Sequence, residues 1–206
     1  MRRVLAATVS LVCLAAWIAP AALADIDLEW RPLNQTVDVG DSLGIGLYAV
    51  SDTVDPQGFS AVQVIIEWDP VYLELTGNDD TGGVDWMGSS FMPGNSFGIN
   101  EADPPADGNG MWVGTYWFGQ EYLAQTEGTL LTTITFDALA KTDGTPVSML
   151  ESLTIPTYPT GYTKVLDLDG SVLGMLGDAA WVEIVPEPAS LSLFVIAAVG
   201  LIRRGR

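Results

Sequence analysis

Between residues 25 and 184 the chain repeats short runs in which apolar and polar residues alternate, each bounded by glycine, proline or aspartate. Strict alternation places successive side chains on opposite faces of a β-strand, and no long apolar pattern of period 3.6 interrupts these runs. The clearest runs are residues 43–49, 62–68, 112–118, 130–138 and 180–185. Many short strands with Gly and Pro turns predict an all-β fold, an antiparallel jelly-roll β-sandwich.

The composition limits how such a sandwich is held together. The chain has no histidine, and its only cysteine, Cys13, lies in the apolar N-terminal stretch. We therefore expect neither disulfides nor cysteine-bound metals in the domain, and no catalytic Cys or His. About 160 residues between the two ends fit one domain that is stabilised by packing and hydrogen bonds.

The charge of the middle region is strongly one-sided. All 26 acidic residues lie between Asp25 and Glu187, where Arg31, Lys141 and Lys164 are the only basic residues, so this region carries a net charge of −23. Such a domain repels nucleic acid and anionic lipid surfaces. The acidic excess serves solubility or, alternatively, the binding of calcium or of a basic partner.

Three segments of the middle region share their order and spacing with a known family. Residues 35–43 hold a strand, the Gly40-Asp41 turn and a second strand; residues 59–75 hold an alternating strand, the Asp69-Pro70 turn and a Leu-rich strand; residues 128–136 hold a strand after a glycine. In this order they resemble a cohesin domain. The resemblance implies an extracellular, non-catalytic jelly roll of about nine strands. Cohesins bind dockerin modules on one sheet face, so it also implies a dockerin-like protein partner.

The N-terminal segment has the pattern of a secretory signal peptide. In residues 1–24 two arginines precede an apolar run, and Pro20 ends that run. The small residues Ala22 and Ala24 stand at the recognition positions for cleavage before Asp25. We expect a signal helix that is removed on export.

The C-terminal segment, residues 185–206, has three parts. They are the motif Pro186-Glu187-Pro188, the apolar run 189–202 and an arginine-rich end. As a helix the apolar run would be about 21 Å long, shorter than the roughly 30 Å of a bilayer core. The segment resembles the PEP-CTERM sorting signal of Gram-negative bacteria. The resemblance implies recognition by an exosortase, transient anchoring of the C-terminal helix in the inner membrane, and delivery to the cell surface or extracellular matrix. An ordinary short membrane anchor is the alternative.

The least strand-like segment, residues 77–110, contains closely spaced carboxylates among Gly and Asn residues. Hard cations need several oxygen ligands on a bendable loop, which makes calcium the one cofactor to consider. The candidate ligands are Asp79, Asp80, Asp103 and Asp107. The EF-hand spacing is missing, so a solvated loop is the alternative interpretation.

Aromatic residues gather between positions 112 and 122. Alternation predicts that Trp112, Tyr116 and Phe118 face the core. Trp117, Tyr122 and the more distant Trp86 are then the candidates for exposed rings that stack on sugars, with packing at the rim of the core as the alternative.

The sequence favours a binding protein over an enzyme. It has no nucleophile elbow, phosphate loop or metalloprotease motif, and no pair of carboxylates stands out as a glycosidase pair. We predict an exported, non-catalytic surface or matrix protein that is sorted by exosortase and carries an adhesive cohesin-like domain. A carbohydrate-binding module acting on extracellular polysaccharide is the alternative.

Overall fold

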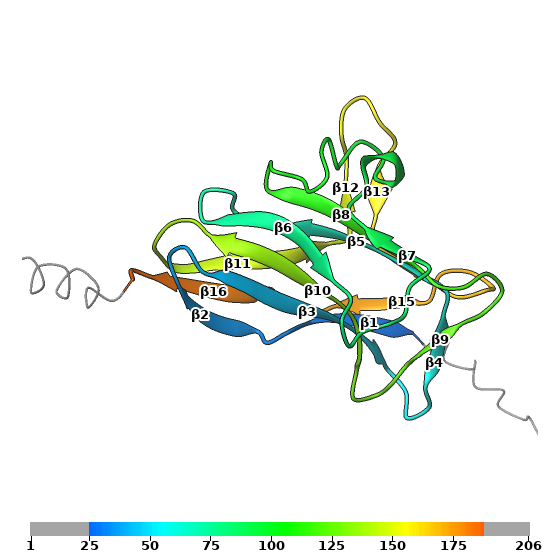
Figure 1. The fold of residues 1–206 in the computed structure, drawn as a ribbon. Coiled ribbons are helices and arrows are strands. Elements are labelled where there is room, and N and C mark those ends of the chain that lie inside the picture. Colours follow the sequence, from blue (N-terminus) through cyan, green and yellow to red (C-terminus); the bar gives the residue numbers. More distant parts are fainter. Residues whose placement is uncertain (1–24, 188–206) are drawn as a thin grey trace, which may run out of the picture.

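The computed structural model describes residues 25–187 (Figure 1). These residues form sixteen short strands and a single turn of 3-10 helix, η1 (Pro93–Asn95). Within this part of the chain no helix has the length and apolar character needed to cross a membrane. The predicted signal peptide with Ala22 and Ala24, the last motif residue Pro188 and the apolar run 189–202 lie outside the described residues.

Most of the strands belong to two sheets. The five-stranded sheet has the order β15 (Leu173–Leu176), β1 (Ile26–Arg31), β3 (Ser42–Ser51), β10 (Thr129–Ala138) and β6 (Leu73–Asp79). The seven-stranded sheet has the order β2 (Asn34–Asp38), β16 (Ala180–Val185), β11 (Thr142–Leu150), β5 (Ala61–Glu67), β8 (Asn109–Thr115) and β7 (Gly88–Ser90), and β14 (Lys164–Leu166) pairs with β5 beyond the end of β11. Two small ribbons complete the fold, β4 (Gln57–Phe59) with β9 (Tyr122–Ala124) and β12 (Ser152–Leu153) with β13 (Gly161–Tyr162).

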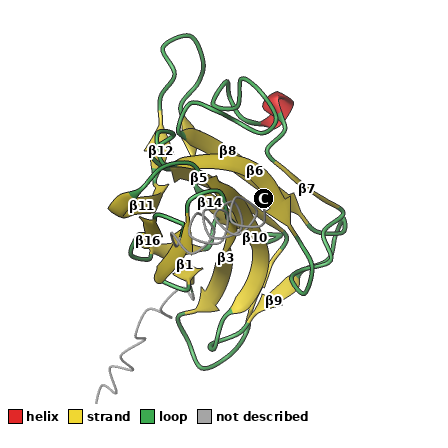
Figure 2. Cartoon of the chain, turned by 60° about the vertical axis from the view of Figure 1, so that its left-hand side comes forward, coloured by secondary structure: helices red, strands yellow, loops and turns green. Residues whose placement is uncertain are grey.

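The core lies between the two sheets, and the strands surround it in Figure 2. On β5 the inward residues Val62, Val64 and Ile66 are fully or almost fully buried, as the alternation of residues 62–68 predicts. Large aromatic side chains fill the space between the sheets, among them Trp30 and Trp112. The predicted all-β sandwich is thereby confirmed.

The expectation of a purely antiparallel fold is wrong at two edges. β15 runs parallel to β1, and β2 runs parallel to β16, whereas the other strand pairs are antiparallel. Pro32, between β1 and β2, has no N–H to donate to a ladder, and the chain passes there from the five-stranded to the seven-stranded sheet. β15 and β16 make the same change of sheet beside them, in the same direction (Figure 1).

Candidate binding surface

The outer face of the seven-stranded sheet is divided into a covered half and an open half. The covered half lies over β5 and β8. There Ile65 and Met111 point away from the main core, yet both are fully buried. They form a second apolar cluster with Ile99, against which Leu153 and Ile155 pack. Two excursions of the chain supply this cover, residues 91–108 and 151–163, which we call the cap; both rise above β8 and β5 in Figures 1 and 2.

Buried hydrogen bonds fasten the cap to the sheet. Asn100 is 2% exposed, its side chain accepts a bond of 2.7 Å from the N–H of Met111, and it donates one of 2.8 Å to the carbonyl of the same residue. The amide of Asn100 thus pairs with β8 as a neighbouring strand would. Gly161 of the second excursion is buried against Ile99 and Met111, where it has no room for a side chain. The cap is therefore a packed part of the fold.

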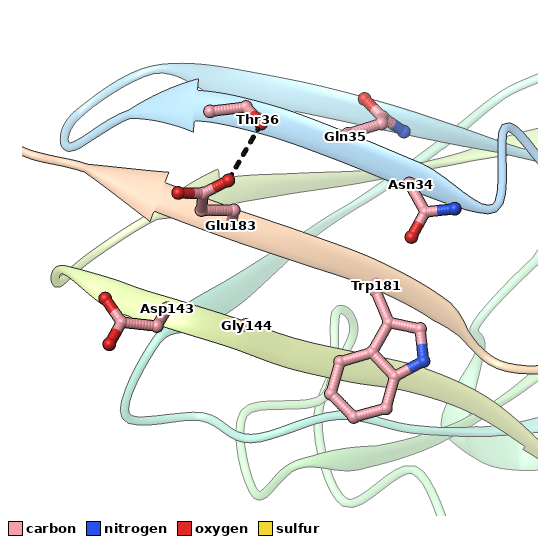
Figure 3. A pocket seen from close by; sticks show the side chains of 7 residues that line it. All are labelled: Asn34, Gln35, Thr36, Asp143, Gly144, Trp181 and Glu183. Atoms are coloured by element: carbon pink, nitrogen blue, oxygen red, sulfur yellow. Dashed lines mark hydrogen bonds between the residues drawn. The ribbon is translucent and has the colours of Figure 1, made fainter.

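The open half lies over β2, β16 and β11. On β16 Val182 and Ile184 are buried, so alternation turns Trp181 and Glu183 outward. The parallel register sets Asn34 beside Trp181 and Thr36 beside Glu183, and the Thr36 hydroxyl donates to the Glu183 carboxylate at 3.2 Å. Figure 3 shows these four side chains together, with the indole extending over β11.

Trp181 is 51% exposed and stands between two shallow hollows. One hollow of about 370 Å³ is lined by Asn34, Gln35, Thr36, Asp143, Gly144, Trp181 and Glu183. The other, of about 560 Å³, is lined by Tyr72, Lys141, Thr142, Asp143, Gly144 and Trp181. The edge of the indole lies alongside Gly144, which has no side chain to cover the ring. We call Asn34, Thr36, Asp143, Gly144, Trp181 and Glu183 the Trp181 platform.

The carboxylates make the platform acidic. Glu183 and Asp143 are both exposed. The nearby Lys141 lies 3.9 Å from the Asp143 carboxylate, and since both side chains are largely in solvent this ion pair contributes little to stability.

The structure changes the set of exposed aromatic residues. The prediction that Trp86 is exposed is wrong: it is 9% exposed, its indole N–H donates to the carbonyl of Leu131 at 2.9 Å, and its ring packs edge-on against Trp112. The prediction that Phe118 faces the core is also wrong, because β8 ends at Thr115 and the chain turns at residues 117–120, leaving Phe118 85% exposed.

The other aromatic candidates lie near that turn. Trp112 is buried, as predicted, and Trp117 is 46% exposed. Tyr122 is half-buried, with its ring 5.4 Å from that of Tyr116 and 6.0 Å from that of Phe59. Trp86, Trp117 and Tyr122 therefore do not form an exposed row.

The candidate calcium ligands do not converge. Asp80 is bonded to the Ser89 hydroxyl at 3.1 Å, and Ser89 lies opposite Gly114 near the end of β8. Asp107 lies two residues before Asn109, the first residue of β8. Asn109 is about 16 Å from Gly114 along that strand, at roughly 3.3 Å per residue. Asp79 is exposed at the end of β6, and Asp103 is exposed in the loop between η1 and β8. In residues 25–187 there is no group of three or more acidic side chains that could hold a metal ion.

Asp79 and Asp80, which are neighbours in the sequence, each have a local structural role. The Thr81 hydroxyl and backbone N–H donate to the Asp79 carboxylate and hold the pKa of Asp79 below its usual range. The Asp80 carboxylate accepts hydrogen bonds from Asn78, Ser89 and Thr132, which lie on β6, β7 and β10. Asp80 thus connects the edges of both sheets.

The described part of the predicted sorting motif lies at the surface. Pro186 and Glu187 follow β16 directly, both are exposed, and they have no regular secondary structure. Pro188, the third residue of the motif, lies outside the described residues.

Sequence reasoning missed Trp181 as a surface residue, although the signal was present. In residues 180–185 the apolar positions Ala180, Val182 and Ile184 alternate with Trp181 and Glu183, which places the tryptophan on the same face as a glutamate.

Comparison with known proteins finds its matches at the level of structure. No protein-family model matches the chain, and neither does any curated protein. A cohesin module from a Clostridium perfringens family 33 glycoside hydrolase is similar, with a TM-score of 0.53, 13% identity and coverage of 80% of this chain and 99% of that one.

Two cohesins solved as complexes are similar to the same extent. The sixth cohesin of Acetivibrio cellulolyticus scaffoldin B, in complex with a Cel5 dockerin, has a TM-score of 0.50 and 15% identity, and the match covers 79% of this chain and 99% of that one. The third ScaB cohesin of R. flavefaciens, in complex with a group 1 dockerin, has a TM-score of 0.50 and 12% identity, with coverage of 81% and 99%. The chain therefore has a β-sandwich fold that resembles the cohesins.

Proposed function

We propose that this chain is an exported, non-catalytic adhesion protein whose sandwich binds a partner protein at the cell surface or in the extracellular matrix. The observation that carries the proposal is the likeness to cohesin modules along about four-fifths of the chain. Two of those cohesins were solved with dockerins bound, which supports a dockerin-like partner for this chain.

The cap is the part of the surface best suited to a protein partner. Met92, Phe97 and Tyr158 are each about half exposed there. A side chain on Gly98 would collide with the ring of Tyr158, so the two excursions touch at this point, next to Phe97 in the chain. Exposed aromatic and methionine side chains are typical of protein interfaces.

The charge around these groups indicates the chemistry of the partner. Glu101, Asp103 and Asp107 are exposed on the same excursion as Phe97. A partner that covers the cap must then present apolar side chains with basic residues at the rim. The sheet beneath the cap is closed by Ile65, Met111 and Ile99, so the contact is made on the cap itself.

A cell-binding assay tests this role. Labelled protein is added to cells of the source bacterium from which the gene has been deleted, and saturable binding is measured. We expect the part of the binding that depends on the cap, measured as the difference between wild type and the double variant Phe97→Ser/Tyr158→Ser, to be lost when the cells are pretreated with protease and retained after periodate oxidation of their glycans. The double variant Phe97→Ser/Tyr158→Ser should bind at least about tenfold more weakly.

Phe118→Ser is the matched control, since it removes an exposed aromatic ring outside the cap. Cap-dependent binding that survives protease, or binding that Phe118→Ser weakens as much as the double variant does, would refute a protein partner at the cap.

We further propose that an exosortase recognises Pro186-Glu187-Pro188 and removes the tail after transient anchoring in the inner membrane of a Gram-negative cell. The exposed, extended Pro186 and Glu187 support access by such an enzyme. Replacing the three motif residues by alanine should leave an uncleaved protein in the inner membrane. Mass spectrometry of the fractions measures this, and a variant that reaches the surface with the same C-terminus as wild type would contradict it.

A further inference from the structure

We infer that the Trp181 platform is a second binding site, for neutral pyranose units of an extracellular polysaccharide. It lies on the open half of the sheet, apart from the cap, and does not depend on the protein partner proposed above. The inference starts from one observation, a large aromatic side chain half exposed on a regular strand in the interior of a sheet.

The backbone beneath the indole is fixed. β16 pairs with β2 on one side and with β11 on the other, and the N–H of Trp181 donates to the carbonyl of Leu33 at 2.8 Å. Gly144 beside the ring leaves its broad face uncovered, and Figure 3 shows that face turned outward over β11. A rigid, bare aromatic surface loses little conformational entropy when a ligand covers it.

The groups at the rim of the indole match a sugar. A pyranose ring has a C–H face, which packs on an aromatic ring, and hydroxyl groups at its edge, which need hydrogen-bond partners. The Asn34 amide, the Thr36 hydroxyl and the Glu183 carboxylate supply donors and acceptors beside Trp181. An apolar partner surface would bury the Asn34 amide, and the Glu183 oxygen that Thr36 does not reach, without partners, at a cost of about 1–3 kcal/mol for each.

The charge of the site selects among polysaccharides. Two carboxylates, those of Asp143 and Glu183, border the indole against one ammonium group, that of Lys141, and the region from Asp25 to Glu187 carries a net charge of −23. Uronate or sulfate groups would be repelled, so the ligand is a neutral polymer.

The shape of the site indicates how the polymer lies. Hollows of about 370 and 560 Å³ flank Trp181, and both open to solvent. These volumes fall in the usual range for small-ligand sites, roughly 300–1,000 Å³. A site open on both sides of the ring accepts internal units of a chain as well as its ends.

Trp117 provides a matched comparison. Its side chain is 46% exposed, close to the 51% of Trp181, but it lies in the turn that follows β8 rather than within a sheet. The two tryptophans therefore differ in their surroundings while exposing similar fractions of their surface.

Affinity electrophoresis tests the inference. The full-length protein, purified in mild detergent, is run through gels that contain mixed-linkage β-glucan, galactomannan, hydroxyethyl cellulose or xylan, and through gels with the anionic polymers alginate and polygalacturonate. We expect retardation by at least one neutral polymer and none by the anionic ones. Trp181→Ala should weaken the interaction at least about tenfold, Trp181→Tyr should retain part of it, and Trp117→Ala should leave it unchanged.

An unaltered urea midpoint for Trp181→Ala shows that any lost binding reflects the site and not unfolding. The inference is overturned if no neutral polymer retards the protein, if Trp181→Ala binds like wild type, or if only anionic polymers bind. Phe97→Ser/Tyr158→Ser serves as a separate arm: it should keep polysaccharide binding while losing the protein partner, so failure of one proposal is distinguishable from failure of the other.

Discussion

The hydrogen bonds around Asp80 allow a stability prediction that also separates a structural role from calcium binding. One carboxylate oxygen accepts from the Thr132 hydroxyl at 2.6 Å, from the Asn78 amide at 3.0 Å and from the Ser89 hydroxyl at 3.1 Å. Ser89 in turn accepts from the indole N–H of Trp112 at 2.9 Å. The substitution Asp80→Ala removes the acceptor that joins the β6–β10 edge of one sheet to β7 of the other.

The magnitude follows from these contacts. A hydrogen bond to an ionised group contributes about 1.5–3 kcal/mol. In the Asp80→Ala variant two of the three donors still have another acceptor. The Thr132 hydroxyl lies 3.3 Å from the carbonyl of Asp79, and the Asn78 amide lies 3.0 Å from the Ser89 hydroxyl. We therefore expect Asp80→Ala to lower the free energy of unfolding by about 3 kcal/mol rather than by the sum of three bonds. For a domain of this size that loss corresponds to a fall in Tm of about 6–12 °C.

Urea unfolding followed by tryptophan fluorescence measures the effect, in EDTA and in millimolar calcium. Asp79→Ala is the control, because this neighbouring carboxylate is exposed and bonds only within its own turn. We expect the control to lower the midpoint far less than Asp80→Ala does, because it loses only the bonds from Thr81, and calcium to change none of the midpoints. If Asp80→Ala keeps the wild-type midpoint, or if calcium stabilises wild type but not the variant, the structural assignment of Asp80 is refuted.

Two further predictions concern the same loop and the cap. Thr81→Val should raise the pKa of Asp79 toward its ordinary value, measured by NMR titration of the side-chain carboxyl; because folding lowers this pKa, the contribution to stability is present above the ordinary pKa and is lost as the pH falls through the folded one. Unchanged titration of Asp79 in that variant would contradict the role of the hydroxyl. Asn100→Ala should lower the free energy of opening of the cap by about 1–3 kcal/mol, seen as faster amide exchange in residues 91–108 with unchanged protection in β3 and β10. Equal acceleration throughout the sandwich would show that the cap does not open by itself.

The alternation of the sequence was sufficient for much of the fold. It predicted the strands over residues 43–49, 62–68, 130–138 and 180–185 correctly, because turn residues bound each run and the buried positions recur at every second residue. The prediction failed at Phe118. The alternation of residue types continues past Thr115 in the sequence, but the strand ends at Thr115 and the backbone then turns.

The cap was harder to predict because its contacts join segments far apart in the chain. One feature of the sequence indicates that the outer face of β5 is covered. Ile65 points outward and its neighbour Ile66 points inward, and apolar residues on both faces of a strand indicate that both faces are buried. The residues that cover Ile65 could not be predicted, because Ile99 lies in a loop without periodicity and Ile155 lies more than fifty residues further along the chain. The Trp181 platform likewise depends on the parallel pairing of β2 with β16, which brings Asn34 and Thr36 beside the last strand.

We propose that this sandwich binds its partners through the outer side of its seven-stranded sheet. Hydroxyl-radical footprinting tests it most directly, because oxidation of exposed Met, Trp, Tyr and Phe side chains is compared between the free protein and the protein bound to extracellular matrix isolated from the source bacterium. We expect protection of Trp181 on the open half and of Met92, Phe97 and Tyr158 on the cap. Phe118, in the turn after β8, and Tyr48, on β3 of the five-stranded sheet, should react as in the free protein. Protection confined to Phe118 and Tyr48, or unchanged oxidation of Trp181 and the cap residues on binding, would contradict it.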